Sequence, residues 1–142
     1  MTVQRIWVVM LLLVACAGGG STSIFDLEVG DCFVDPADLT EVSAVEVVSC
    51  DEPHDNEISD LPPYPAGPAE SYPGDSVIDT WASEACIGSF EAYVGISYEE
   101  SVLVVGTISP RAETWDDGDR EVICVLYEPG EKLTGSMRDS GR

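Results

Sequence analysis

Five cysteines divide this chain into two parts. Cys16 ends a short apolar run near the N-terminus, whereas Cys32, Cys50, Cys86 and Cys124 are spread through the rest. Four cysteines in a small exported domain predict two disulfides, because oxidised thiols persist outside the reducing cytosol. Three pairings are possible. We favour Cys32 with Cys50, which would join neighbouring strands, and Cys86 with Cys124, which would fix a helix onto a strand.

A zinc site built from the same cysteines, with His54, is the competing interpretation. The chain contains no Cys-x-x-Cys or His-x-x-x-His pair, and its last four cysteines are separated by 18, 36 and 38 positions. Zinc sites usually take their ligands from closely spaced pairs. The spacing therefore favours disulfides, and we expect neither a metal nor a cofactor.

The N-terminus has the layout of an export signal. A positive Arg5 precedes an uncharged apolar run over residues 6–14, which is too short to span a bilayer. Leu13-Val14-Ala15-Cys16, followed by a Gly/Ser stretch, also resembles the lipobox of bacterial lipoproteins. The resemblance implies that residues 1–15 are removed and that Cys16 carries lipid, which would anchor the protein at the extracytoplasmic face of the cell membrane. An ordinary secretory signal with an incidental cysteine is the alternative.

The charge of the chain excludes some partners. Removal of Arg5 with the signal leaves 5 basic against 27 acidic residues, a formal charge of −22. Such a charge repels nucleic acid, which we exclude as a partner. The acidic residues are dispersed among apolar ones, which indicates a folded domain with a solvated acidic face and not a disordered tail. Adaptation of the host to high salt is another possible cause of the acidity.

The hydrophobic pattern predicts an α+β domain over residues 25–138, a small mostly antiparallel sheet with one main helix packed on it. The helix should begin near Ser76, where Ser76-x-x-Asp79 offers a capping box, and end at Gly95. Its apolar stripe includes Cys86. Strands are expected near residues 25–29, 42–49, 57–61, 102–108 and 120–127, the fourth of them buried, and a helical turn over 110–115.

The segments between and around these elements are expected to be irregular. Residues 16–24 should form the lipidated cysteine and a flexible tether, and residues 139–142 a frayed tail. The proline-rich residues 61–68 should form an exposed loop, either a linker or a polyproline segment that binds a partner.

Several motifs, taken together, resemble the septum formation-related domain of actinobacterial envelope proteins. They cover residues 26–138 and read, in chain order, Val-Gly-Asp-Cys-Phe from 29, Cys-Asp-Glu-Pro-His-Asp-Asn-Glu from 50, Trp-x4-Cys-x3-Phe-x2-Tyr-Val-Gly from 81, Gly-Asp-Arg-Glu-Val-x-Cys from 118 and Leu-Thr-Gly-Ser from 133. The resemblance implies a small extracytoplasmic domain with a disulfide-bonded core, often tethered to the membrane. The resemblance implies no catalytic residue. The family name alone implies that such a domain takes part in cell division.

His54 is the strongest candidate for chemistry, because it is the only histidine and acidic residues flank it. A hydrolase would also need a nucleophile within reach, such as Ser49 or Ser59, and neither lies in a nucleophile elbow. We favour a structural role in which the imidazole bonds to the backbone of a turn.

Other candidate residues favour structural roles. The acidic turn at residues 116–119 faintly suggests calcium but lacks the ligand pattern of an EF-hand. Arg120 is expected to be an ion-pair partner, with an anionic ligand as the alternative. Trp81 and Trp115 are expected in the core, with a sugar-stacking surface as the alternative.

These observations predict a non-enzymatic, lipid-anchored interaction or accessory module of the bacterial cell envelope. Its expected partners are the membrane, through the anchor at Cys16, and envelope or division proteins. A small hydrolase that uses His54 and a small-ligand or metal-binding module are the alternatives.

Overall fold

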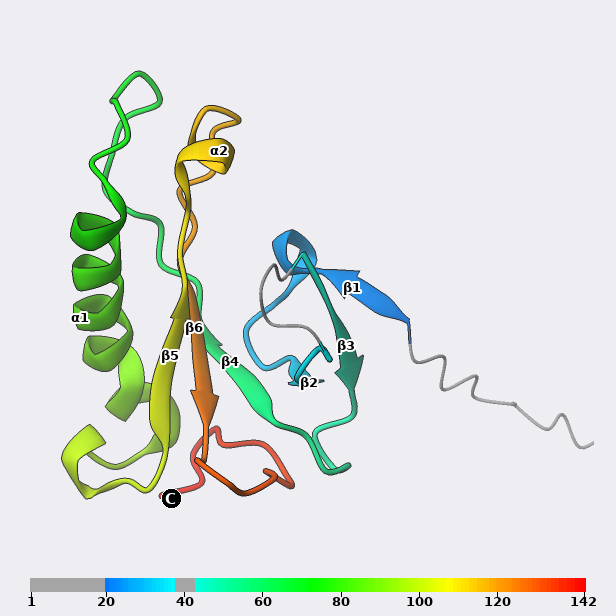
Figure 1. The fold of residues 1–142 in the computed structure, drawn as a ribbon. Helices are drawn as coiled ribbons and strands as arrows, with labels where there is room; N and C mark the ends of the chain where they lie inside the picture. Colours follow the sequence, from blue (N-terminus) through cyan, green and yellow to red (C-terminus); the bar gives the residue numbers. More distant parts are fainter. Residues whose placement is uncertain (1–19, 38–42) are drawn as a thin grey trace, which may run out of the picture.

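The computed structural model describes residues 20–37 and 43–142. Their core is one six-stranded antiparallel sheet in the order β1-β3-β2-β4-β6-β5, with the long helix α1 packed beside β4, β5 and β6 (Figure 1). The predicted α+β class, a sheet with one main helix, is confirmed. The elements are β1 (Ser21–Ser23), η1 (Ile24–Asp26), β2 (Cys32–Val34), β3 (Ala44–Val48), β4 (Asn56–Asp60), α1 (Asp75–Val94), η2 (Tyr98–Glu100), β5 (Val104–Ile108), α2 (Ala112–Trp115) and β6 (Ile123–Tyr127).

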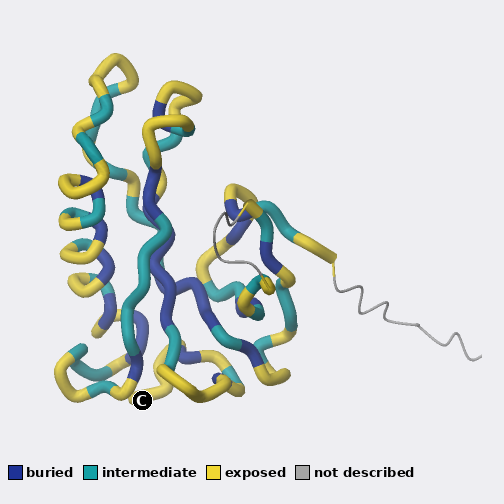
Figure 2. The backbone as a smooth tube through the Cα atoms, viewed as in Figure 1, coloured by how far each residue is buried: buried dark blue, intermediate teal, exposed yellow. Residues whose placement is uncertain are grey.

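Strand β6 carries apolar side chains on both faces, and it therefore separates two parts of the core. Ile123 and Val125 pack with the buried residues of β2, β3 and β4, whereas Cys124 and Leu126 lie on the face that α1 covers. This is the two-sided apolar pattern expected for a central strand. Figure 2 shows the result, with burial following β6, β4 and the sheet-facing side of α1.

Helix α1 has the predicted extent but a different N-terminal cap. Its N-cap is Gly74, which has a φ of 103° and no side chain to cap the helix. The predicted capping box from Ser76 to Asp79 is wrong, because both residues already lie inside the helix. The C-terminal prediction is confirmed, since Gly95 adopts the left-handed conformation that ends many helices.

The strand predicted over residues 25–29 is wrong. Ser23 accepts a hydrogen bond from the backbone of Phe25 and opens the short helix η1, so the chain buries Ile24 and Leu27, three positions apart, instead of alternate residues. Phe25 is 57% exposed. The neighbouring residues Ser21–Ser23, placed in the tether by the sequence, form β1 against β3.

Strand β5 lies at the edge of the sheet and is half-buried throughout, not buried as its apolar run predicted. Among the strands that the structure describes, only β6 pairs with it, over all five residues. In this chain the apolar run over residues 102–108 therefore forms an edge strand, with α1 on one side and an open groove on the other.

Two segments predicted to be loose are held by backbone hydrogen bonds. In the proline-rich loop, the amide of Tyr64 donates to the carbonyl of Arg120 at 2.7 Å, and Pro62 accepts a bond from Val122. The tail is also fixed, because the amides of Asp139 and Gly141 donate to carbonyls at the end of α1. The prediction of a frayed tail is wrong. None of the helices within residues 20–37 and 43–142 is both long and apolar enough to cross a bilayer.

Candidate functional site

The four cysteines of the domain form the two favoured disulfides. Cys32 bonds to Cys50 with a Cα–Cα distance of 5.2 Å, and Cys86 bonds to Cys124 with a distance of 5.4 Å. The second bond ties α1 to β6, as predicted. Cys16 and the predicted signal lie outside the described residues.

His54 is fully buried and makes a backbone contact, as its structural interpretation predicts. Its Nδ1 lies 2.8 Å from the carbonyl oxygen of Glu52, and its own backbone pairs with Leu133. The suggested nucleophiles bond elsewhere: the Ser59 hydroxyl donates to the Cys124 carbonyl, and the Ser49 hydroxyl accepts from a backbone amide. The structure does not assemble these residues into a catalytic group.

A buried carboxylate, Glu57 on β4, is the polar centre of the core. Its Oε1 accepts hydrogen bonds from the hydroxyls of Tyr93 and Ser136 at 2.6 and 2.7 Å, and its Oε2 accepts one from the Met137 amide at 2.7 Å. The side chain is 0% exposed. These bonds satisfy a group that would otherwise be costly to bury, and they hold the C-terminal segment against β4 and α1.

The network also determines the protonation of Tyr93. Burial and the bond to Glu57 both favour the neutral phenol, so they raise the pKa of Tyr93 far above its usual range. Arg138 lies over the Tyr93 ring, with 4.5 Å from its guanidinium carbon to the ring centroid. Tyr93 is therefore a permanent hydrogen-bond donor at physiological pH.

Arg120 differs from its prediction as an ion-pair partner. Its guanidinium carbon lies 3.5 Å from the centroid of the Trp115 ring, and its Nη1 donates to the carbonyls of Trp115 and Asp119. Trp115 is in the core, as predicted, and Trp81 is half-buried against Tyr64. Asp116, Asp117 and Gly118, in the acidic segment suggested for calcium, form an exposed turn.

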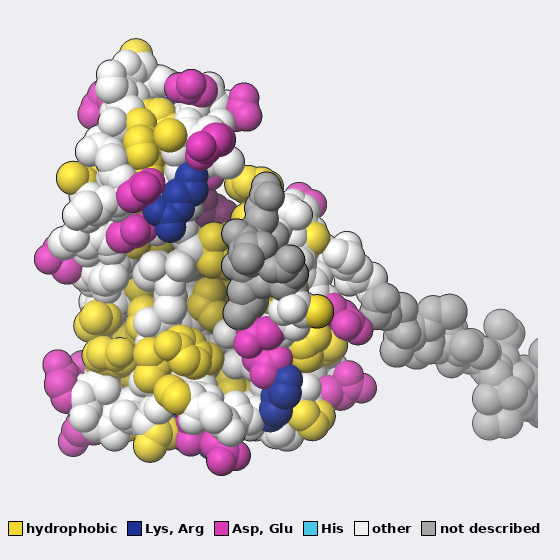
Figure 3. Space-filling view, in the orientation of Figure 1, with side chains coloured by type: hydrophobic (Ala, Val, Ile, Leu, Met, Phe, Trp, Pro, Cys, Tyr) yellow, Lys and Arg dark blue, Asp and Glu magenta, His cyan; other side chains and the backbone are white. Residues whose placement is uncertain are grey.

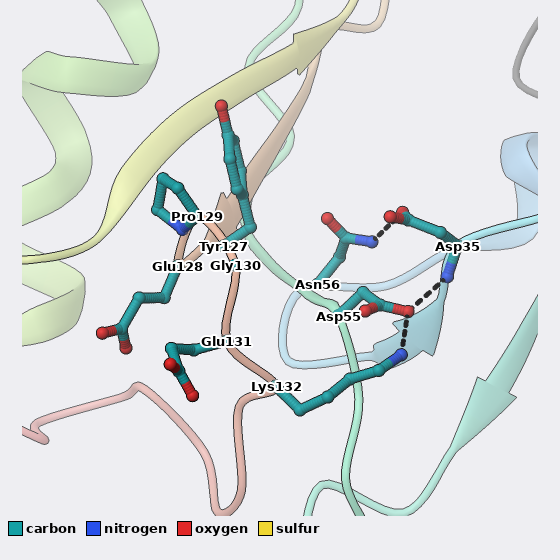
Figure 4. Close-up of a pocket in the computed structure, with 9 residues that line it drawn as sticks. All are labelled: Asp35, Asp55, Asn56, Tyr127, Glu128, Pro129, Gly130, Glu131 and Lys132. Carbon is teal, nitrogen blue, oxygen red and sulfur yellow. Dashed lines mark hydrogen bonds and ion pairs between the residues drawn. The ribbon is translucent and has the colours of Figure 1, made fainter.

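The surface feature best suited to binding is a groove on the sheet face away from α1. We define the groove as two adjoining open hollows of about 360 and 410 Å³ that share Asp35, Asn56 and Tyr127. The apolar hollow is completed by Phe33, Pro36, Gly106, Thr107, Ile108 and Val125, and the acidic hollow by Asp55, Glu128, Pro129, Gly130, Glu131 and Lys132. Figure 4 shows the acidic hollow between β6 and the start of β4.

Hydrogen bonds organise the acidic end of the groove. Lys132 Nζ lies 2.5 Å from Asp55 Oδ2, which also accepts a hydrogen bond from the backbone N–H of Asp35. The side-chain amide of Asn56 in turn donates to the Asp35 carboxylate (Figure 4). Burial by itself would raise the pKa of Asp55, but the bonds from Lys132 and Asp35 outweigh it and lower that pKa. Asp55 is therefore ionised at neutral pH.

The surface around the groove carries few free cations. Figure 3 shows dark blue basic groups on this face, each beside magenta acidic ones. The pairs include Lys132 with Asp55 and Arg111 with Asp75 and Asp79. Glu131 is exposed at the rim of the groove.

Sequence reasoning missed the groove and the carboxylate network. The sequence places Glu57 only in a strand, and the pattern Asn-Glu-Ile-Ser-Asp of that strand does not distinguish the buried Glu57 from the less buried Asp60. Tyr127 and Lys132 also carry no signal, because they meet Asp35 and Asn56 only through strand pairing.

The fold and these features define a small, disulfide-bonded α+β domain whose antiparallel sheet has a helix on one face and a polar-rimmed groove on the other. A family model described as Septum formation matches residues 29–141, so the chain belongs to this family. The resemblance carried by the sequence motifs is confirmed. No curated protein and no solved structure was found to match the chain.

Proposed function

We propose that this protein is a lipid-anchored accessory module at the extracytoplasmic face of the bacterial membrane, which takes part in septum formation by binding a partner segment in the groove. Membership of the Septum formation family supports the process, and the lipobox-like sequence at Cys16 supports the location. In this proposal the domain recognises a partner and catalyses no reaction of its own.

The groove is the observation that carries the proposal. Its apolar floor is lined by Phe33, Ile108 and Val125, of which Phe33 and Val125 are largely buried and Ile108 is half-buried. Its other end presents acidic groups, with a single lysine already paired to Asp55. Charge complementarity therefore favours an extended partner segment with basic residues and one apolar side chain. The net charge of the chain would also speed the encounter with such a partner.

The structure limits how far the domain extends from its proposed anchor. Because β1 begins at Ser21, only five residue steps separate the sheet from Cys16. A chain of that length spans at most about 18 Å. A lipid at Cys16 would therefore keep the domain near the membrane surface.

The burial of His54 argues against the hydrolase alternative. A general base must come within hydrogen-bond distance of its substrate, and the imidazole is 0% exposed. A buried His54 therefore supports a binding role for the domain, through the groove, over a hydrolase that uses this histidine.

Proximity labelling in living cells tests the proposal, with the wild type compared with two variants. Gly106 has an ordinary φ, and a Cβ there would lie 3.5 Å from the Tyr127 ring, so Gly106→Ile should fill the apolar hollow without backbone strain. Glu131→Lys reverses a charge at the rim, and Glu99→Lys, on η2 away from the groove, is the matched control.

We expect division proteins to be labelled by the wild type and by Glu99→Lys, and to be lost from both groove variants. Equal labelling by all four proteins would refute the groove, and a label set without division proteins would refute the role in septum formation. Release of a Cys16→Ala protein from membranes checks the anchor, since full retention would contradict it.

A further inference from the structure

The imidazole of His54 is oriented as a metal ligand would be. Nδ1 faces the carbonyl oxygen of Glu52, and a carbonyl only accepts, so Nδ1 carries the proton. In the neutral ring Nε2 then presents its lone pair, and this buried atom has no hydrogen-bond partner among the described residues. Metal-bound histidines characteristically donate their other N–H to a carbonyl or carboxylate in this way.

Two further ligand types lie beside His54. Ligand atoms of Cys32, His54 and Glu57 all lie within 4.8 Å of one another, and all three residues are buried. A tetrahedral zinc site separates such atoms by roughly 3.3–3.8 Å, so a small contraction would suffice. Within the described residues Glu57 Oε2 accepts one hydrogen bond, from the Met137 amide, while Tyr93 and Ser136 orient the carboxylate through Oε1.

The disulfide determines whether this set can bind a metal. Cysteine binds zinc as a thiolate, and the sulfur of Cys32 is instead bonded to Cys50. Cys50 keeps part of its surface exposed, whereas Cys86 and Cys124 are both fully buried. A dithiol reductant therefore reaches the first disulfide more easily than the second.

We propose that reduction of the Cys32–Cys50 disulfide creates a buried zinc site with Cys32, His54 and Glu57 as ligands. A dithiol attacks Cys50 Sγ, the S–S bond breaks, and Cys32 leaves as a thiolate. The second thiol of the reductant then displaces Cys50, so the reductant leaves as a disulfide and the protein has gained two electrons and two protons. Zinc binding releases the Cys32 thiol proton to solvent, and the fourth position is filled by Cys50 or water.

The charge of the reduced site favours a cation. A Cys32 thiolate would lie within 4.8 Å of the Glu57 carboxylate, whose hydrogen-bond partners among the described residues are Tyr93, Ser136 and Met137 and include no cation. The guanidinium of Arg138 lies over the Tyr93 ring and makes no hydrogen bond to Glu57 within the described residues. Two neighbouring negative charges in a low-dielectric environment are unfavourable unless a cation compensates them. A divalent ion does so, and the intact disulfide needs none.

A pair of single variants tests the site without any reductant. Cys50→Ser and Cys32→Ser each remove the same disulfide and free the remaining cysteine of that pair, but only Cys50→Ser retains all three ligands. Both keep Cys86–Cys124, which intact mass spectrometry verifies. Circular dichroism checks that both variants are folded, and zinc affinity is then measured by calorimetry and by metal content after dialysis.

We expect Cys50→Ser to bind one zinc per chain at least roughly 100-fold more tightly than Cys32→Ser or the oxidised wild type. Addition of His54→Ala to Cys50→Ser should abolish this difference. Cobalt in place of zinc should give thiolate-to-metal absorption in Cys50→Ser alone. Equal affinities of the two single variants, or an absence of binding by Cys50→Ser, would overturn the proposal.

Zinc binding by the partly reduced wild type provides an independent measurement that needs no substitution. Reduction by a phosphine, stopped when the intact mass has risen by two hydrogens, should confer the same zinc binding. If the singly reduced protein binds no zinc while remaining folded, the site does not form and the proposal is wrong.

Discussion

The hydroxyl of Tyr93 donates a 2.6 Å hydrogen bond to Glu57, and this contact joins the last turns of α1 to strand β4 inside the core. The two residues are 36 positions apart in the sequence. Because Glu57 also holds Ser136 and Met137, one carboxylate connects the sheet, the helix and the C-terminal segment.

Loss of the Tyr93 hydroxyl should therefore destabilise the protein. We expect Tyr93→Phe to lower the free energy of unfolding by about 1.5–3 kcal/mol, the range for a bond to a charged group. The matched control is Tyr98→Phe, whose ring packs on Phe90 and whose hydroxyl makes no hydrogen bond within the described residues. Denaturant titration measures both variants, and equal losses would contradict the role of Glu57.

The same hydroxyl predicts a dependence on alkaline pH. Burial and the Glu57 bond raise the pKa of Tyr93 above its usual value of 10.0, which is the value in the unfolded chain. The contribution of Tyr93 is therefore complete below pH 10 and declines as the pH rises beyond it. The stability difference between wild type and Tyr93→Phe, measured by denaturation from pH 8 to 11, should shrink above pH 10. A constant difference across this range would argue against the prediction.

The two disulfides should differ in their effect on stability. Cys86 and Cys124 are 38 positions apart and fully buried, whereas Cys32 and Cys50 are 18 apart. Loop entropy gives about 4 kcal/mol for Cys86–Cys124 and about 3 kcal/mol for Cys32–Cys50. We expect Cys86→Ala/Cys124→Ala to melt at a lower temperature than Cys32→Ala/Cys50→Ala, and the reverse order would show that the loop lengths do not govern their stabilities.

Arg120 should be intolerant of lysine, because it uses the plane of its guanidinium. Arg120→Lys loses the stack on Trp115 and the paired carbonyl bonds, for an expected cost of about 1–2 kcal/mol and a change in tryptophan fluorescence. Arg111→Lys is the control, since Arg111 is about half-exposed in ion pairs with Asp75 and Asp79. Such surface pairs are worth at most about 1 kcal/mol. Equal losses in the free energy of unfolding for the two variants would show that the stack on Trp115 and the carbonyl bonds of Arg120 do not stabilise the fold.

The elements that could be predicted are those whose signal lies within one segment. The apolar residues of α1 recur every three or four positions along its 20 residues, and β6 presents apolar residues on both faces, so each pattern indicates which side chains are buried. The short strand β2 and the turn after Ser23 carry too few residues for such a pattern. The predicted strand at 25–29 was wrong because alternation over five residues also fits a tight turn.

The sequence by itself predicted two disulfides and favoured the pairing that forms, and it predicted the main helix and the family, because each rests on a pattern along the chain. The tertiary structure alone decided that Glu57 would be buried with Tyr93 and Ser136, that the tail would be held, and that Asp35, Asn56 and Tyr127 would meet in one groove. Ser136 and Met137 bond to a carboxylate 79 and 80 positions away. Contacts of that kind depend on strand order and register, and no local pattern of residues encodes them.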